Sequence, residues 1–312
     1  MTRCEFVEAA VSSGALPHAS VALSCRVVGL PRASFYAWRA RREGRRAPSE
    51  RARSDGALTE RIRAIHAESS GTYGSPRVHA ALGTRGVRCG RKRVERLMRR
   101  QGLRGAERRA ARVRTTVADP AAAPAGDLVE RAFSPDAVGG PDRLWVADIT
   151  YVATGEGWLY AAVVLDCFSR RVVGWAMADH LRAELVTAAT GMALQRRCPR
   201  HGQLTHHSDQ GCQYTSLAIG QQLRDAGVLP SMGSVGDCYD NAVAESYFAT
   251  LKVELVYRHD WPTRAAARGA IFRYIETWYN LRRLHSTLGY TSPAAFEQAH
   301  RAAQPVTSTP AA

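Results

Sequence analysis

From about residue 143 onward the sequence changes from helical to strand-like periodicity, and this change limits the fold more than any other feature. The segment LWVADITYVAT (144–154) alternates strictly, which predicts a strand with one face toward the core. The segment WLYAAVVLD (158–166) is continuously apolar, as is typical of a central strand buried on both faces. RRVVGWAM (170–177) predicts a third strand. Three consecutive strands of this kind favour antiparallel neighbours in one sheet.

Helices and short strands alternate after these three strands. This order predicts an α/β fold, a mixed five-stranded sheet with helices on both faces. Asp148 lies on the first strand and Asp209 closes the fourth, the usual position for a functional group in an open α/β sheet. The expected elements are helices at about 181–197 and 215–226 and strands at 204–208 and 228–232.

Three acidic residues, Asp148, Asp209 and Glu245, are the candidate catalytic and metal-binding residues. Glu245 lies on a predicted helix that Asp240 caps, and 35 residues separate it from Asp209. Ionised carboxylates resist leaving water unless positive charge compensates them. Two divalent cations roughly 3.5–4 Å apart would compensate, and would also activate the attacking oxygen and stabilise the leaving oxygen of a phosphodiester. Three unrelated surface acids are the alternative.

Positive charge is concentrated in the first third of the chain. The net charge of all 312 residues is +15, yet residues 1–115 hold 26 Arg or Lys and 9 Asp or Glu, a net charge of +17. Residues 116–312 carry a net charge of −2. This partition predicts a nucleic-acid-binding arm joined to a near-neutral domain. A solvated helical surface is the alternative, and codon bias toward Arg does not explain the partition.

Cysteine usage and hydropathy indicate where the protein works. The 7 cysteines are odd in number and form no C-x-x-C pair, which favours free thiols in a reducing cytosol over a zinc knuckle or a disulfide framework. The first residues lack the apolar core of a signal peptide, and no apolar run approaches the length of a membrane span. We therefore expect a cytoplasmic protein that is nucleoid-associated when bound to DNA and has no membrane partner.

The first third is predicted to be helical. Residues 19–43 predict two short helices joined at Gly29-Leu30-Pro31, as in a helix-turn-helix, with an ordinary helical hairpin as the alternative. The polar, basic stretch 44–56 is expected to be a linker. A second helical unit runs from about 57 to 104, where Ser75 is expected to cap a helix that has Pro76 at its first position.

The last helix of this unit ends at Gly102 and begins with basic residues. Arg91, Lys92 and Arg93 stand at its N-terminus, where a recognition helix presents side chains to a DNA groove. The alternative is a basic, solvated helix face. The hypothesis is that these residues contact DNA.

Several segments carry a resemblance to a known family. The chain resembles the second-reading-frame product of the IS-three family of bacterial insertion-sequence transposases, in the retroviral integrase superfamily. The likeness covers roughly residues 15–298. The matching segments are GTYGSPRVHAAL, RKRVERLMRRQGLRG, WVADITYV, LDCFSRRVVGW, HHSDQGCQYTS, GDCYDNAVAESYFATLKVEL and WYNLRRLHSTLGYTSPAAFE.

The resemblance implies a ribonuclease H-like catalytic core with Asp148, Asp209 and Glu245 as a DDE triad that binds two Mg²⁺, for which Mn²⁺ can substitute. It implies metal-dependent DNA cleavage and strand transfer at the terminal inverted repeats of an insertion sequence, through a circular DNA intermediate. The implied partners are double-stranded element-end and target DNA, further copies of the chain assembled on DNA, and an upstream-reading-frame protein joined by ribosomal frameshifting.

Small departures from the family pattern leave the triad intact. Cys212 replaces a usual Ser, Asp237 stands where Asn is common, and Met232 stands where a polar or basic residue is frequent. A non-catalytic DNA-binding regulator of transposition is the rival interpretation, but such a protein has no reason to keep three converging carboxylates. A metal-dependent nuclease without strand transfer is a weaker alternative.

Two further residues are expected to share the face of the helix that carries Glu245. Asn241 precedes Glu245 by four positions and Lys252 follows it by seven, so all three project from one side. Lys252 suits a terminal DNA phosphate, and Asn241 a neighbouring base or sugar. The alternative for a lone lysine is a solvated charge.

Other polar residues near these segments are expected to be structural. Asp166 is predicted to cap the turn that follows its strand, and Asp237 and Asp240 are rival ligands with the wrong spacing. His206 and His207 adjoin Asp209 and are expected to be satisfied by backbone, with a role in positioning water or substrate as the alternative. His285 is expected to pack or to contact the DNA backbone.

The predicted domain organisation follows from these segments and from the resemblance. It comprises a helix-turn-helix-like segment at 1–47, a basic helical DNA-binding domain at 57–115, a linker at 116–142, an integrase-type catalytic core at 143–260, a helical extension at 261–298 and a disordered tail at 299–312.

Overall fold

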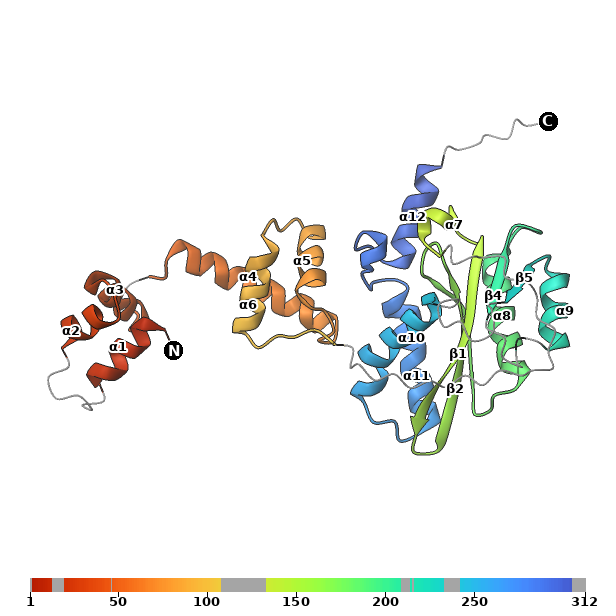
Figure 1. Cartoon of the computed structure of the whole chain (residues 1–312), viewed down its shortest axis with the longest axis horizontal. Helices are drawn as coiled ribbons and strands as arrows, with labels where there is room; N and C mark the ends of the chain where they lie inside the picture. The colour runs from red at the N-terminus through yellow and green to blue at the C-terminus, as the bar shows by residue number, and fades with distance from the viewer. Residues whose placement is uncertain are drawn as a thin grey trace. The chain divides into compact units, whose positions relative to one another are not determined.

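The computed structural model (Figure 1) divides into two compact units, Met1–Ala64 and Ile65–Ala312, which are described separately. No helix in the described part is long and apolar enough to cross a membrane. The structure describes residues 2–12, 20–45, 47–107, 133–208, 214, 216–232 and 242–304.

The first unit has its own small core. The side chains of Val7, Cys25 and Phe35 are buried together, one from each of the helices α1, α2 and α3. Gly29 adopts a φ of 63° in the turn between α2 and α3, a conformation that glycine reaches without steric strain. The two short helices predicted from the sequence are present, whereas α1 was not predicted. The bounds are Arg3–Ser12 for α1, Val21–Val27 for α2 and Arg32–Arg42 for α3.

The stretch 44–56, predicted to be a linker, is partly helical. Helix α4 spans Glu50–Glu68, and the hydroxyl of Ser49 accepts a hydrogen bond from the amide of Ala52 at 3.2 Å. Arg, Ala and Glu are good helix formers even where no face is apolar. The linker prediction was wrong because polar composition was given more weight than helix propensity.

Helices α5 and α6 lie in the second unit. Helix α5 spans Ser75–Thr84 and α6 spans Arg91–Arg100. The N-cap of α5 is Gly74 and not Ser75, so Pro76 stands at the second position of the helix, one residue later than predicted. Gly102 follows α6 with a φ of 66°, which agrees with the predicted end of that helix. The buried faces are Val78, Ala81 and Leu82 on α5 and Val94, Leu97 and Met98 on α6.

The described strands form one mixed, five-stranded sheet in the order β3-β2-β1-β4-β5. Strands β1 and β2 are antiparallel, as are β2 and β3. Strand β4 lies parallel to both β1 and β5. The predicted mixed α/β sheet is therefore confirmed. The strands span Leu144–Thr154, Gly157–Asp166, Val172–Ala178, Thr205–Ser208 and Leu229–Met232.

Helices cover both faces of the sheet (Figure 1). On one face, Ala147 and Val164 pack with residues of α8 and α9. On the other face, Val146 and Val163 pack with residues of α10, α11 and the π-helix η2. Because side chains alternate along a strand, Asp148 belongs to the face that α10 covers. The bounds are Ala183–Arg197 for α8, Leu217–Asp225 for α9, Ala242–Glu254 for α10, Arg264–Arg273 for α11 and Tyr274–Tyr279 for η2.

The C-terminal extension belongs to the core of the sheet domain. Ile271, Ile275 and Tyr279 are buried in the same cluster as Val146, so one face of this segment packs in the core. Helix α12 continues beyond the expected start of a disordered tail at 299, and residues 305–312 lie outside the described part. The remaining bounds are Val256–Arg258 for η1, Ser286–Leu288 for η3 and Pro293–Ala303 for α12.

The expected linker at 116–142 ends earlier than predicted. The ring of Phe133 is buried in the core of the sheet domain, and a short helix, α7, spans Pro135–Val138. Ser134 caps α7 through a hydrogen bond from the amide of Ala137 at 3.2 Å. Residues 133–142 are thus part of the sheet domain, while 116–132 lie outside the described residues.

A buried polar network attaches α12 and α8 to the edge of β1 and β2. Asp166 accepts hydrogen bonds from the amides of Asp142 and Ser169 at 2.7 and 2.8 Å. The Ser169 hydroxyl also donates to Glu297 at 2.8 Å. Arg197 binds both carboxylate oxygens of Glu297, at 2.9 and 3.0 Å, and Asp142 at 2.7 Å. The prediction that Asp166 caps the turn is confirmed, and burial raises its pKa to about 6.

We expect Glu297→Gln to destabilise the protein by up to about 3–5 kcal/mol, because it removes one of the two carboxylates that compensate the buried Arg197, leaving only Asp142. The side chains of Arg197 and Glu297 are only 7% and 2% exposed. Urea unfolding measures the change. Arg301→Gln is the control, since Arg301 is 66% exposed although it also faces Glu297, and we expect less than about 1 kcal/mol for it. Equal losses in both variants would contradict the account.

Candidate active site

Asp148 is held in an apolar row of the central strand. Its neighbour across β2 is the buried Val163. The carboxylate is half-buried, and its Oδ1 accepts a hydrogen bond from the amide of Ile149 at 2.7 Å. This bond fixes the carboxylate against its own strand. The side chain projects from the face that α10 covers.

Glu245 lies in the first turn of α10 and is exposed. The buried side chains of Val243, Tyr247 and Leu251 anchor the helix on the core. Partial removal from water raises the pKa of the Glu245 carboxyl above its ordinary value. The packing of α10 against β1 places the helix beside the strand that carries Asp148.

Lys252 follows two turns later on α10 and is half-buried. Burial lowers the pKa of its ammonium group, while the negative charge of Asp148 acts in the opposite direction. Its Nζ lies 5.3 Å from the centre of the Tyr151 ring, within the range of a cation–π contact. Lys252 therefore stands between α10 and β1 and is not the fully solvated charge of the alternative interpretation.

Tyr151 and Trp158 were not singled out from the sequence. Their rings meet edge to face, with centres 4.9 Å apart, and both side chains are exposed. The signal in the sequence that could have identified them is the presence of aromatic residues at strand positions expected to face solvent. The two rings thus pack together across β1 and β2, and Lys252 contacts one of them, Tyr151.

Several predicted site residues lie outside the described part, namely Asp209, Asn241 and the rival acids Asp237 and Asp240. Ser208, which directly precedes Asp209, ends β4 beside Ala147 of β1. Within the described ranges, which omit Asp209, no group of three or more His, Cys, Asp or Glu is placed to hold a metal ion. The described part of the site thus consists of Asp148, Glu245 and Lys252.

The two histidines before Asp209 face opposite sides of the sheet. His207 pairs with Ser231 through Nδ1 and the serine hydroxyl at 2.9 Å, and its ring meets Phe133. His206 lies on the other face, where Nε2 has no hydrogen-bond partner among the described residues. His207 Nδ1 thus pairs with a side chain and not with the backbone as expected, whereas a backbone hydrogen bond does act on the His206 ring. His285 is buried against Tyr279, so the packing interpretation is confirmed.

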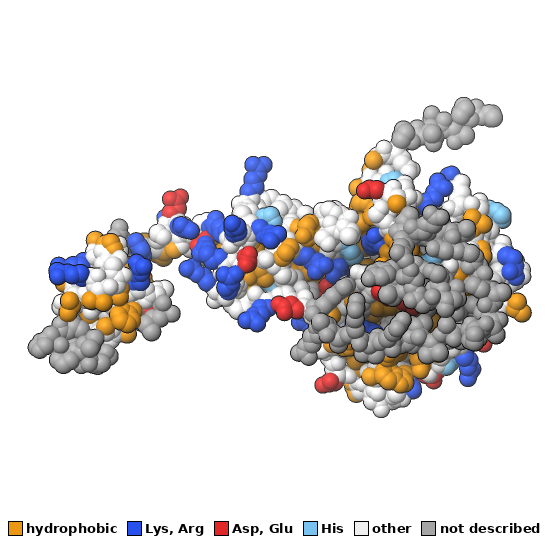
Figure 2. Space-filling view, viewed as in Figure 1, with side chains coloured by type: hydrophobic (Ala, Val, Ile, Leu, Met, Phe, Trp, Pro, Cys, Tyr) orange, Lys and Arg blue, Asp and Glu red, His pale blue; other side chains and the backbone are white. Residues whose placement is uncertain are grey.

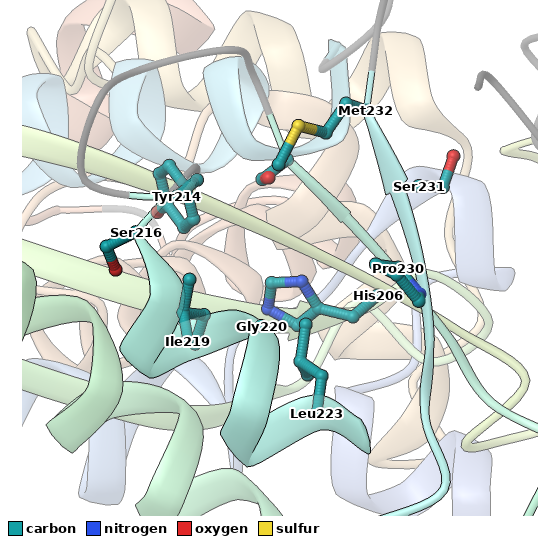
Figure 3. A pocket seen from close by; sticks show the side chains of 10 residues that line it. His206, Tyr214, Ser216, Ile219, Gly220, Leu223, Pro230, Ser231 and Met232 are labelled. Atoms are coloured by element: carbon teal, nitrogen blue, oxygen red, sulfur yellow. The ribbon is translucent and has the colours of Figure 1, made fainter. Parts of the chain in front are cut away.

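His206 lines a cavity of about 190 Å³ between β4, β5 and α9. Its ring points into the cavity between Ile219 and Leu223, whereas Ser231 points away (Figure 3). Burial lowers the pKa of His206 to about 4, so the ring is neutral at physiological pH. The cavity lies on the face of the sheet opposite Asp148.

The basic residues at the start of α6 lie on its solvent-facing side. Arg91 and Lys92 are exposed in the first turn, and Arg93 is half-buried. The opposite side of the helix is buried through Val94 and Leu97. Figure 2 shows Lys and Arg side chains gathered over the helices of residues 50–107.

Family models match most of the chain. The model described as HTH-like domain matches residues 53–111. Two models described as integrase core domain match residues 139–238 and 226–293.

Relatives with known names are similar over most of their length. A putative transposase for insertion sequence element IS986/IS6110 of Mycobacterium tuberculosis is 41% identical over 82% of this chain and 92% of its own length. The transposase for IS629 of Shigella sonnei is 39% identical over 89% and 91%. The transposase InsF for IS3A of Escherichia coli is 38% identical over 89% and 94%. Among solved structures, the catalytic core of BIV integrase is 22% identical over 52% of this chain and 99% of its own, with a TM-score of 0.39.

The fold and the matched domains define a DNA transposase with an integrase-type catalytic core. The chain belongs to the bacterial insertion-sequence transposases of the IS-three type, as the resemblance in its motifs indicated. Membership implies polynucleotidyl transfer on DNA, with DNA as partner. Proteins with this core domain use divalent metal ions. The rival interpretation as a non-catalytic regulator is not favoured.

We expect His206 to make the protein less stable as the pH falls from about 6.5 toward 4. In the unfolded chain His206 binds a proton near its ordinary pKa of about 6.5. In the folded chain it binds a proton only near pH 4. Stability is therefore full above this window and decreases within it, by up to about 3 kcal/mol. Urea unfolding of wild type and His206→Gln at each pH measures the difference.

Asp166 changes the stability in the opposite direction, because its raised pKa of about 6 stabilises the folded chain as the pH falls. Only the difference between wild type and variant therefore isolates the contribution of His206. His201→Gln, at an exposed position, is the matched control. A stability difference between wild type and His206→Gln that is independent of pH would contradict this account, because it would mean that His206 binds a proton at the same pH in the folded and the unfolded chain.

Proposed function

We propose that Asp148, Asp209 and Glu245 form the metal-binding triad of a transposase that cuts the ends of its element and joins them to target DNA. The observation that carries the proposal is the packing of α10, which bears Glu245 and Lys252, against β1, which bears Asp148, with Lys252 in contact with Tyr151 of β1. Glu245 projects from the same helix one turn after its start.

The position of Asp209 in the chain supports its inclusion. It follows Ser208, the last residue of β4, and Ser208 is paired in parallel with Ala147, the residue before Asp148. In a parallel pair the register continues along both chains, so the position after Ser208 would lie beside Asp148, within β1. Acids from β1, from the end of β4 and from α10 would then meet there.

The donor set fits Mg²⁺ and Mn²⁺, which prefer carboxylate oxygens. Asp148 is only half-buried and Glu245 is exposed, so both remain reachable from solvent. A bound cation favours the ionised carboxylate and would lower the raised pKa of Glu245. Two such ions would activate the attacking oxygen and stabilise the leaving oxygen.

The chain's own residues orient the reaction. Asp148 is held on its strand by the amide of Ile149, and Lys252 offers a positive charge beside it for a DNA phosphate. In cleavage, water attacks a terminal phosphorus, the P–O3′ bond breaks, and the freed 3′ oxygen takes up a proton. In transfer, that 3′-OH attacks a target phosphodiester, and a target 3′ oxygen leaves. Asn241 would contact the base or sugar next to the reacting phosphate.

We further propose that α6 binds the terminal inverted repeat through Arg91, Lys92 and Arg93. Family membership supports target DNA, further copies of the chain on DNA, and an upstream-frame protein or its frameshift fusion as the other partners. A cytoplasmic location follows from that role.

Loss of any triad acid should abolish both steps while folding and DNA binding persist. Asp148→Asn, Asp209→Asn or Glu245→Gln removes a charge that holds the cations, which is worth several kcal/mol at the transition state. Cleavage and joining of end-labelled duplexes in Mg²⁺ and in Mn²⁺ measure the loss.

The matched control is Glu184→Gln, because Glu184 is also exposed in the first turn of a helix, α8. It should leave both rates unchanged. Near wild-type joining by Glu245→Gln would remove Glu245 from the triad.

Lys252→Met should weaken strand transfer by roughly 1.5–3 kcal/mol, the range for hydrogen bonds to charged groups. The methionine keeps the apolar stem against Tyr151, so stability should change little. Single-turnover joining of a pre-cleaved end is the measurement, and Lys252→Arg should retain more activity. Indistinguishable rates for wild type and Lys252→Met would mean that Lys252 contacts no reacting strand.

Replacing Arg91, Lys92 and Arg93 together by Ala should weaken binding to terminal duplex and flatten its salt dependence, by about 0.9 in the log–log slope per lost phosphate contact. A control triple, Arg200, Arg224 and Arg268 to Ala, removes the same charge from exposed positions elsewhere. Equal changes in the two triples would indicate a general charge effect and no groove contact.

A further inference from the structure

Among the contacts that join the DNA-binding helices to the catalytic domain, several meet at one short backbone segment, residues 282–284. Tyr73, which precedes α5, is 3% exposed. Its hydroxyl accepts a hydrogen bond from the amide of Leu284 at 2.8 Å and lies 3.5 Å from the carbonyl oxygen of Arg282. Its ring packs against Trp278 with centres 5.5 Å apart. Tyr73 thus joins parts of the chain that are more than two hundred residues apart.

Arg77 on α5 binds the carbonyl group of the same segment. Its Nε donates to the carbonyl oxygen of Leu284 at 3.0 Å, and its guanidinium lies over the Tyr73 ring at 5.8 Å. Both backbone polar groups of Leu284 are therefore bound by the DNA-binding segment. A second contact joins Arg258 to the carbonyl oxygen of Ser70 at 2.7 Å.

The same segment is attached to the catalytic helix on its other side. Arg283 binds both carboxylate oxygens of Glu254, at 2.9 and 2.7 Å. These side chains are 4% and 5% exposed, and Tyr274 donates a further hydrogen bond to Glu254 at 2.9 Å. Glu254 is the last residue of α10, the helix that carries Lys252 and Glu245.

These contacts form a continuous connection from the DNA-binding helices to the candidate active site. A bidentate, buried Arg–carboxylate pair has a narrow range of geometries. The backbone hydrogen bonds of α10 link its last turn, which holds Glu254, to its first turn, which holds Glu245. The position of α5 and α6 is thereby tied to that of Glu245.

We propose that Tyr73 and Arg77 are positioning residues, which fix the distance between the duplex bound by α6 and the acid on α10 and so select the phosphodiester that is cut. The ligand is the duplex end of the element, and the inference rests on the proposed transposase reaction. The segments GTYGSPR and WYNLRRLH, which carry these residues, are explained as the two halves of one docking contact.

The test uses the full chain with Tyr73→Phe and Arg77→Met together, which removes the polar contacts and keeps the ring and the stem. The matched control is Tyr257→Phe with Arg85→Met, because Tyr257 is 71% exposed and Arg85 pairs with Glu68 at the surface. Single-turnover cleavage of a labelled terminal duplex is mapped at nucleotide resolution, beside melting temperature and duplex affinity.

In the double variant we expect a cut at the correct phosphodiester that is roughly 10–100-fold slower, with new products at neighbouring positions and unchanged duplex affinity. A merely structural role would lower all products in proportion to the folded fraction and would not move the cut. A single cut at the wild-type position, at any rate, would overturn the proposal.

A second readout does not depend on cleavage. Hydrogen exchange is followed in the full chain with and without the duplex. In wild type and control, the duplex should slow exchange in α6 and also in the last turn of α10 by about fivefold or more. In the double variant it should protect α6 only, and the Leu284 amide should exchange faster even without DNA. An α10 response that is absent in wild type, or unchanged in the variant, would overturn the proposal even if the proposed reaction failed.

Discussion

The packing of α10 on the sheet face that carries Val146 and Asp148 determines where every polar group of the site can lie. The helix is fixed by buried Val243, Tyr247 and Leu251, so its opposite side keeps Glu245 exposed in the first turn and Lys252 half-buried beside Asp148. An acid in an apolar strand is tolerated here because a cation shares its surroundings. The apolar core thus sets the electrostatics of the site.

Buried polar pairs, and not apolar contact alone, fix the elements that surround this core. Glu297 with Arg197 attaches α12 to the end of α8, and Glu254 with Arg283 attaches the C-terminal extension to α10. Such pairs contribute little net stability compared with apolar substitutes, but they tolerate only a few geometries. In this transposase both pairs lie where two elements are joined, α12 with α8 and the C-terminal extension with α10. There they fix one relative orientation of the two elements.

Local periodicity made the sheet and the α10 face predictable. The alternation in 144–154 identified β1 and the face of Asp148, and the spacing of Glu245 and Lys252 identified one side of α10. Contacts between distant residues, such as Tyr73 with Leu284 or Arg197 with Glu297, leave no periodic trace in the sequence. Helix α4 was missed at its start because helix propensity competed with polar composition. The surroundings of His206 and His207 could not be predicted either, because they depend on which elements cover the sheet face toward which each side chain points.

The most direct test of the account is a crystal structure of the full chain on its terminal duplex with Mn²⁺, with the manganese positions taken from anomalous scattering. The account predicts two peaks roughly 3.5–4 Å apart, with Asp148, Asp209 and Glu245 as their protein ligands. Manganese bound elsewhere, with Asp148 and Glu245 lacking any metal while the duplex is in place, would contradict it.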